Sequence, residues 1–217
     1  GESLEIEADV IGDGHDLLGC VLHWRRAGEA SWHEARMTEG HNDAWSARFT
    51  PTDVGAWEYR VQAWVDPFIT WQHDLRRRVD AGQDIAVDLE IGASIVEDHA
   101  GAAGAEDREA VKHWAGKLVS EESQEARARA ALSEELAALM WRTSPRRFAV
   151  ESPALPLWTD RPRALHSAWY EMFPRSAAFE PGAHGTLRDV EARLDYVAEM
   201  GFDVLYLPPI HPIGRTN

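Results

Sequence analysis

The stretch GAWEYRVQAWVDPFITWQHDLRRRV, residues 55–79, contains the change of pattern that decides the fold. Its first half alternates apolar and polar side chains with the period of two that is typical of a half-buried strand. After Asp66 and Pro67 the apolar side chains recur every three or four residues, as they do on one face of an amphipathic helix. The apolar residues of this face are Phe68, Trp71, Leu75 and Val79. We therefore predict a strand that ends at Val65 and a helix that follows it directly.

Towards the N-terminus the alternating pattern recurs in shorter segments, which are separated by clusters of Gly, Asp and Asn. The apolar phases of these segments are Leu4, Ile6, Ala8 and Val10, then Leu18, Cys20, Leu22 and Trp24, and then Trp45, Ala47 and Phe49. Short strands with such turn signals predict an antiparallel β-sandwich over residues 1–66. Because Trp24, Trp45 and Trp57 lie on the apolar phase, we expect their indole rings in the core.

Towards the C-terminus helical spacing continues through three further segments. Asp84 is placed to cap a second helix, Asp107 lies near the start of a third, and a fourth runs from about Gln124 to Trp141. Short polar connections predict an up-and-down bundle of four helices over residues 67–151. The proline-rich residues 152–164 return to extended signals. We favour the interpretation that they complete the sandwich, so that the bundle is an insertion, over the alternative of a linker or edge strand.

The C-terminal part of the chain predicts one βαβ unit. We expect a strand over residues 167–173, a helix opened by a capping box of Thr186 with Asp189 and closed by Gly201, and a buried strand over residues 204–207. A parallel pair of strands with one crossover helix cannot bury both faces of its sheet. The partners that cover this unit are therefore expected beyond the end of the sequence.

Composition narrows the classes of partner. The 217 residues carry 22 basic and 37 acidic side chains, a formal net charge of −15, which disfavours nucleic acid and anionic membranes as partners. The single cysteine, Cys20, excludes an intrachain disulfide, and no apolar run is long enough to span a membrane. The first residues are neither a native start nor a signal peptide, so we expect a cytosolic protein of which this chain is a piece. No metal-binding motif is present, and we expect neither a metal nor a cofactor.

Two motifs carry a resemblance to a known family. The segments WYEMFPRS, residues 169–176, and HGTLRDVEARLDYVAEMGFDVLYLPPIHPIG, residues 184–214, resemble strand one, helix one and strand two of the catalytic barrel in the α-amylase superfamily, glycoside hydrolase family thirteen. Within it, AWYEMFPRS together with PPIHPIGRTN is most similar to the α-1,4-glucan:maltose-1-phosphate maltosyltransferases. The resemblance implies a multidomain protein in which an immunoglobulin-like β-sandwich with an inserted four-helix bundle is followed, over residues 165–217, by the first βαβ unit of a truncated (β/α)8 barrel.

The same resemblance implies an activity. Members of this family transfer maltosyl units from α-maltose 1-phosphate to the non-reducing end of α-1,4-glucans, with retention of configuration, in the synthesis of glycogen-like glucan. Retention requires two carboxyl groups about 5 to 5.5 Å apart, and in the superfamily these are an Asp and a Glu that follow strands four and five. Both lie beyond Asn217, so we assign no catalytic residue and expect the chain alone to be inactive. The family also implies a cytoplasmic homodimer formed through the sandwich and the bundle.

The best candidates for contact with substrate are His211, Arg215 and Asn217, because they follow strand two at its carboxyl end, where barrel loops build active sites. The guanidinium of Arg215 suits the phosphate of a sugar phosphate. We favour the plainer interpretation that Arg215 orders its loop. Glu171, within strand one, is interpreted as a structural partner in a hydrogen bond or ion pair and not as a catalytic acid.

Two rival functions remain from the sequence. One is another enzyme of the α-amylase superfamily, which the helical insert disfavours. The other is a non-catalytic glycan-binding or dimerisation module, because exposed indole rings such as those of Trp32, Trp64 or Trp71 can stack on sugars. We favour core or interface positions for these three rings. Trp64 is out of phase with its strand and leads into the helices, where it is placed to cover the junction between sandwich and bundle.

Overall fold

A computed structural model describes residues 2–211 of the chain. The chain divides into two compact units. The N-terminal unit consists of residues 2–52 and 56–157, and the C-terminal unit consists of residues 53–55 together with the chain from Trp158 onwards.

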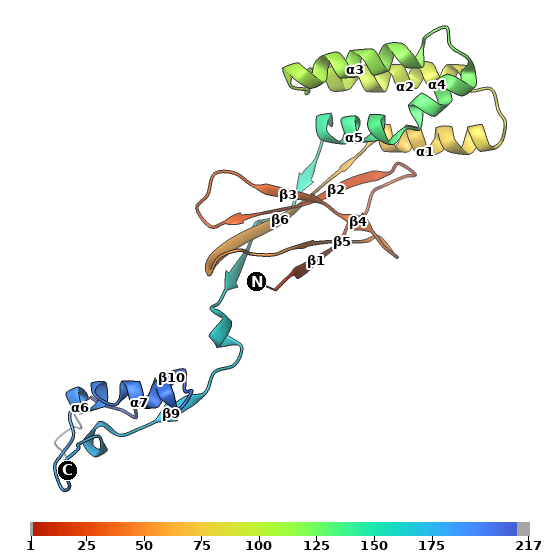
Figure 1. The fold of residues 1–217 in the computed structure, drawn as a ribbon. Helices are drawn as coiled ribbons and strands as arrows, with labels where there is room; N and C mark the ends of the chain where they lie inside the picture. The colour runs from red at the N-terminus through yellow and green to blue at the C-terminus, as the bar shows by residue number, and fades with distance from the viewer. Residues whose placement is uncertain (1, 212–217) are drawn as a thin grey trace. The chain divides into compact units, whose positions relative to one another are not determined.

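The N-terminal unit begins with two sheets whose neighbouring strands pair antiparallel (Figure 1). The first sheet has the order β1–β5–β4, with β1 at Leu4–Asp9, β5 at Ala44–Phe49 and β4 at Thr38–Glu39. The second has the order β3–β2–β6–β7, with β3 at His33–Arg36, β2 at Leu18–Arg26, β6 at Gly55–Val65 and β7 at Val150–Glu151. A further strand, β8 at Leu155–Thr159, also pairs with β6.

The apolar phases of both sheets meet in one core. Its buried members are Cys20, Leu22, Met37, Trp45 and Phe49, and partly buried residues of β1, β6 and β8 pack against them. Trp45 and Trp57 are buried as predicted, whereas Trp24 is only partly buried and lies against this core. The alternation in the sequence therefore gives the correct inward face on each of these strands.

The chain leaves the second sheet at the end of β6 and returns to the same strand after the helices. Val150 of β7 lies opposite Ala63 of β6, and the Ser152 amide donates to the Val61 carbonyl at 2.9 Å. Leu157 of β8 packs against the sheet core. Residues on either side of the helical segment thus flank one long strand.

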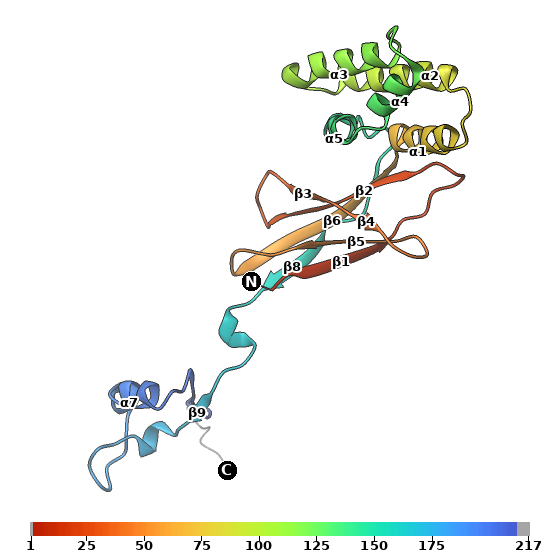
Figure 2. The same cartoon turned by 45° about the vertical axis from the view of Figure 1, so that its right-hand side comes forward.

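Five α-helices lie between β6 and β7 (Figure 2). They are α1 at Pro67–Asp80, α2 at Ala86–Asp98, α3 at Ala105–Leu118, α4 at Gln124–Ala131 and α5 at Glu134–Thr143, with a 3-10 turn at His99–Gly101 after α2. They share an apolar core that contains Phe68, Trp71 and Leu75, the face predicted for α1. Asp66 caps α1, as the change of period at this residue indicates, because its Oδ1 accepts hydrogen bonds from the amides of Phe68 and Ile69.

The prediction of a single fourth helix over residues 124–141 was wrong. The helix breaks after Ala131, and Ser133 begins α5 instead of continuing α4. The Ser133 hydroxyl accepts the Leu136 amide at 3.3 Å and donates to the Ala130 carbonyl at 2.8 Å. A serine that bonds both turns in this way ends one helix and caps the next. The segment between β6 and β7 therefore has five α-helices where four were expected.

The C-terminal unit contains a short parallel pair, β9 at Trp169–Glu171 and β10 at Val204–Tyr206. Between them lie a 3-10 turn at Pro174–Ser176 and two short helices, α6 at Leu187–Glu191 and α7 at Leu194–Glu199, while another 3-10 turn at Pro162–Ala164 precedes β9. The predicted capping box is present, because Asp189 Oδ2 accepts from both the amide and the hydroxyl of Thr186 at 2.7 Å. Gly201 follows α7 with a φ of +86°, the left-handed conformation expected of a glycine at a helix end.

The expected strand over residues 167–173 and the expected single helix are both shorter in the structure. β9 ends at Glu171 because Pro174 starts a 3-10 turn. The helix breaks at residues 192–193, where the Arg193 guanidinium donates to the carbonyls of Ala177 and Ala178. None of the helices within residues 2–211 has both the length and the apolarity required to cross a membrane.

Candidate functional site

Of the three predicted substrate contacts, the structure places one. His211 is exposed and follows β10. Arg215 and Asn217 lie outside the described residues. The role of the three residues therefore stays a prediction.

Glu171 lies at the end of β9 and lines a pocket of about 290 Å³ within the C-terminal unit. The other residues of this pocket are Tyr170, Met172, Phe173, Ser176, Arg193, Tyr196 and Val197. Within residues 2–211 the Glu171 carboxylate has no hydrogen-bond or ion-pair partner, so the structural pairing expected for it is not found there.

The indole rings that suggested sugar platforms are covered on their faces. Two guanidinium groups lie over the Trp32 ring, those of Arg25 at 4.1 Å and Arg60 at 4.6 Å from the ring centroid. Trp64 has the Arg146 guanidinium at 4.6 Å and the Trp141 ring at 5.3 Å. A cation over an aromatic face occupies surface that a sugar would use, so these contacts disfavour stacking on Trp32, and the buried Trp64 ring is not open to it.

Trp71 is excluded for a different reason. Its side chain is buried, and its Nε1–H donates to the Asp88 carbonyl at 2.7 Å. Trp64 and Trp71 are buried, in agreement with the expected core or interface positions, whereas Trp32 is only partly buried and belongs to neither apolar core. The exposed indoles are instead Trp158, 67% exposed, and Trp169, 59% exposed.

Arg146 joins the segment that leaves α5 to the outer face of the second sheet. Its two terminal nitrogens donate to the two carboxylate oxygens of Glu34 at 2.7 Å each, and one of them also donates to Gln62 Oε1 at 3.1 Å. His23 Nε2 lies 3.0 Å from the same Glu34 carboxylate. The Arg146 guanidinium, with a smaller effect from His23, holds the pKa of Glu34 below its ordinary value. Pattern analysis missed this cluster because its members are up to 112 residues apart.

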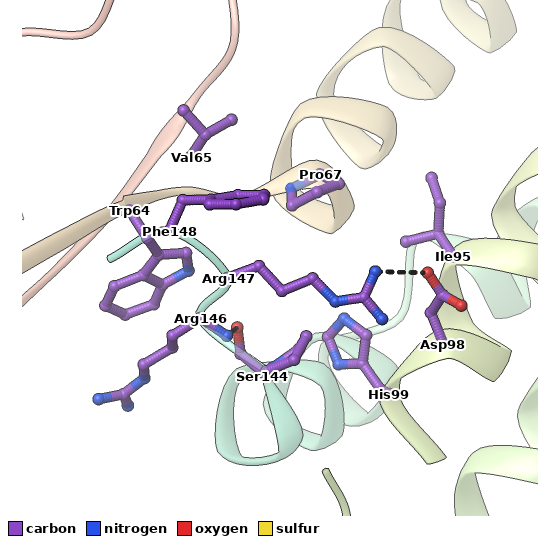
Figure 3. Close-up of a pocket in the computed structure, with 11 residues that line it drawn as sticks. Trp64, Val65, Pro67, Ile95, Asp98, His99, Ser144, Arg146, Arg147 and Phe148 are labelled. Carbon is purple, nitrogen blue, oxygen red and sulfur yellow. Dashed lines mark hydrogen bonds and ion pairs between the residues drawn. The ribbon is translucent and has the colours of Figure 1, made fainter. Parts of the chain in front are cut away.

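A second pocket, of about 370 Å³, lies within the N-terminal unit where β6, α1, α2 and the segment after α5 meet (Figure 3). Its walls are mostly apolar, and its lining residues are Trp64, Val65, Pro67, Ile95, Asp98, His99, Ser144, Pro145, Arg146, Arg147 and Phe148. Polar groups gather at one side, where Arg147 Nη1 lies 3.6 Å from Asp98 Oδ2 beside the buried His99 ring. Volume and lining are those of a small-molecule site.

Burial holds the pKa of His99 below its ordinary value of 6.5, although Asp66 and Asp98 act in the opposite direction. The Thr143 hydroxyl donates to the Leu139 carbonyl at 2.7 Å, so towards His99 it can only accept. His99 Nδ1 lies 3.3 Å from that hydroxyl and can donate a hydrogen bond to it.

The backbone of the pocket rim is strained. Arg146 has a φ of +43° and Phe148 a φ of +58°, and neither is a glycine. Such residues cost free energy and persist where other contacts hold them, most often at functional sites. The sequence gives one signal of this, the Ser-Pro pair that stops α5 ahead of the Arg-Arg-Phe run. Over residues 2–211 no group of three or more His, Cys, Asp or Glu side chains is placed to hold a metal ion.

The family of the chain follows from comparison with known proteins. Residues 1–161 match the family model described as alpha-1,4-glucan:maltose-1-phosphate maltosyltransferase, domain N/S. Because this match covers more than half of the chain, the chain belongs to that family.

Relatives with that function in their names align with the whole chain. It is 47% identical over 218 residues to the alpha-1,4-glucan:maltose-1-phosphate maltosyltransferase of Chlorobaculum tepidum, and 42% identical over 222 residues to maltosyltransferase 1 of Streptomyces coelicolor. The corresponding protein of Cereibacter sphaeroides is 40% identical over 217 residues. All of this chain is covered in each case, but only 32%, 33% and 36% of the respective relatives. The chain thus spans about a third of the length of the curated relatives it matches.

Proposed function

We propose that the chain is part of a longer polypeptide that transfers maltosyl units from α-maltose 1-phosphate to the non-reducing end of α-1,4-glucans, with retention of configuration. The observation that carries this proposal is the family match over residues 1–161, joined to relatives of that name that align with the whole chain. The motifs at residues 169–176 and 184–214, which fall outside the family model, support it independently.

In this proposal each part of the chain has a distinct role. The two sheets form an immunoglobulin-like sandwich, the helices α1 to α5 are an insertion in it, and β9 and β10 are the first two strands of a (β/α)8 barrel. The return of β7 and β8 to strand β6 supports the insertion. The parallel pairing of β9 with β10 across a helical connection supports the barrel. Sandwich and helices would also form a cytoplasmic homodimer.

The chemistry would belong to residues that this chain does not contain. One carboxylate would displace phosphate from the donor and form a covalent maltosyl intermediate. The other group would then take the proton of the acceptor's terminal 4-hydroxyl as that hydroxyl attacks the intermediate and releases the carboxylate. His211, Arg215 and Asn217 would contact substrate from the loop after β10. Arg215 would either bind the donor phosphate or hold that loop in an ordered conformation. An Arg215→Ala variant of the whole polypeptide separates these roles, because loss of a phosphate contact raises KM for the donor, whereas loss of loop order lowers kcat and stability.

The experiment for the function uses the whole polypeptide with α-maltose 1-phosphate and a maltooligosaccharide of defined length. Mass spectrometry should find acceptors that grow by two hexose units at a time, with one phosphate released per step. Proton NMR of the new linkage should find only the α anomer. Growth of the acceptor by single hexose units, or free maltose as the main product, would contradict the proposal.

A second candidate function is a non-catalytic glycan-binding module. Only the exposed rings of Trp158 and Trp169 favour it, because the other suggested platforms are covered. Calorimetric titration of the chain with maltooligosaccharides tests it. Heat of binding that disappears in Trp158→Ala would support a module, and no heat would favour the enzyme.

A further inference from the structure

The pocket rim at Phe148 has two features that cost stability and that the N-terminal unit does not use. The Phe148 side chain is 98% exposed, and its backbone is left-handed. An exposed phenyl group gains nothing from burial, and a non-glycine residue with positive φ is strained. An aromatic face at the mouth of a cavity of about 370 Å³ is, by contrast, well suited to stack on a ligand ring.

The polar side of the pocket offers both donors and acceptors in a small space. The Arg147 guanidinium donates, the Asp98 carboxylate accepts, and the buried His99 ring lies beside them. The Arg147–Asp98 pair is long, at 3.6 Å, and both side chains are 64% exposed. Such a pair contributes little to stability, so a ligand that bonds to both partners can replace it. The opposite charges of Arg147 and Asp98 cancel, and the pocket therefore favours an uncharged ligand.

The distribution of these groups limits the shape of the ligand. The walls formed by Val65, Pro67, Ile95 and Phe148 are apolar, and the Arg147, Asp98 and His99 groups lie together. Two further polar groups of the lining are already engaged, the Arg146 guanidinium with Glu34 and the Trp64 Nε1–H with Asp66. A hexose carries hydroxyl groups around its whole rim, and those facing the apolar walls would lose their hydrogen bonds to water. A purely apolar ligand would leave Arg147 and Asp98 without new partners. A planar ring with one polar edge meets both conditions.

We propose that this pocket binds an uncharged, planar nitrogen heterocycle of the nucleobase type. The ring stacks on Phe148 between the apolar walls, and a donor and an acceptor on one edge bond to Asp98 and Arg147. Figure 3 labels these three residues around the pocket. Every residue that lines this site lies in the N-terminal unit.

The test uses the whole polypeptide and 9-methyladenine, which has the polar edge but neither sugar nor phosphate. Saturation-transfer difference NMR, titrated with ligand, gives the dissociation constant, expected between about 10 µM and 1 mM for so small a ligand. Phe148→Ala and Arg147→Gln should each weaken binding by about fivefold or more. Arg48→Gln is the matched control, because Arg48 is also an exposed arginine in an ion pair, with Glu5, and its loss should leave binding unchanged.

A second variant guards against loss of folding. Val65→Trp fills the pocket from a position that is 44% exposed, and it should abolish binding while circular dichroism confirms the fold. Binding of equal strength in wild type, Phe148→Ala and Val65→Trp would overturn the proposal. So would saturable binding in this pocket of maltose or benzoate in place of 9-methyladenine, or no saturable binding of the heterocycle at all.

Discussion

For Gly92, in the middle of α2, helix propensity and the structure predict opposite effects of an alanine substitution on stability. On helix propensity alone, Gly92→Ala should stabilise the protein by about 1 kcal/mol. In the structure, however, a Cβ at this position would overlap the Trp71 ring. That ring is buried and held by its hydrogen bond to the Asp88 carbonyl at 2.7 Å. We therefore expect alanine at Gly92 to destabilise the N-terminal unit.

The size of the effect follows from these contacts. Forcing an extra carbon into a packed core costs about 1–3 kcal/mol, and breaking the indole hydrogen bond adds about 1 kcal/mol. After the gain in propensity, Gly92→Ala should lower the free energy of unfolding by about 1–3 kcal/mol. The melting temperature should fall by roughly 2–4 °C for each kcal/mol.

Gly116 in α3 is the matched control, because a Cβ there meets nothing within 4 Å. Gly116→Ala should stabilise by about 0.5–1 kcal/mol, since only the propensity changes. Urea unfolding followed by circular dichroism measures both variants against wild type. Equal stabilisation by the two alanines would refute the packing of Trp71 on Gly92.

The remaining predictions concern a cap, a histidine and a thiol. Asp66→Ala should lower the free energy of unfolding by about 2–4 kcal/mol, because it removes a helix cap and leaves the buried Trp64 Nε1–H, which lies 3.1 Å from Asp66 Oδ2, without an acceptor. In urea unfolding, Ser123→Ala, which removes an exposed cap, should lower this free energy by less than half as much. An equal loss in the two variants would contradict the role of Asp66. Burial lowers the pKa of His99 below 6.5, so the unfolded chain binds more protons than the folded chain just below that pH. The free energy of unfolding should therefore be highest above pH 6.5 and fall as the pH drops through 6.5. Urea midpoints that show the same pH dependence in His99→Gln would assign this loss to another group. Burial raises the pKa of the Cys20 thiol to about 11. A disulfide reagent at about pH 8 should therefore react with this thiol only after denaturant is added. Rapid labelling of the native chain would place the thiol outside the core.

Local signals in the sequence predict the elements that depend on local contacts. The change of period at Asp66 locates the end of β6 and the start of α1, and the Thr186–Asp189 pair locates the start of α6. The break between α4 and α5 was missed although Ser133 signals it, because the apolar face continues through the serine and periodicity alone does not register a cap.

Contacts between distant residues were beyond the sequence. Nothing in the pattern pairs Arg146 with Glu34, and nothing predicts that Arg146 and Phe148 adopt left-handed backbone conformations. The strain at these residues is set by the geometry with which the chain returns from α5 to β7. The pocket beside Phe148 could therefore be found only in three dimensions.

The covered indoles have a consequence for function. With guanidinium groups over Trp32 and Trp64 and with Trp71 buried, the exposed aromatic rings on and beside the sheets are those of Phe148 and of Trp158 in β8. Capture of glucan by this part of the chain would have to use these two rings, and we propose that the N-terminal unit instead supports a catalytic region.

The central claim, that these 217 residues support a maltosyltransferase whose chemistry lies in the rest of the polypeptide, is tested most directly by phosphate release. The chain and the whole polypeptide are compared at equal molar concentration, with α-maltose 1-phosphate and a glucan acceptor. We predict steady phosphate release by the whole polypeptide and none by the chain alone. Turnover by the chain, or a whole polypeptide that is folded and releases no phosphate, would contradict the account.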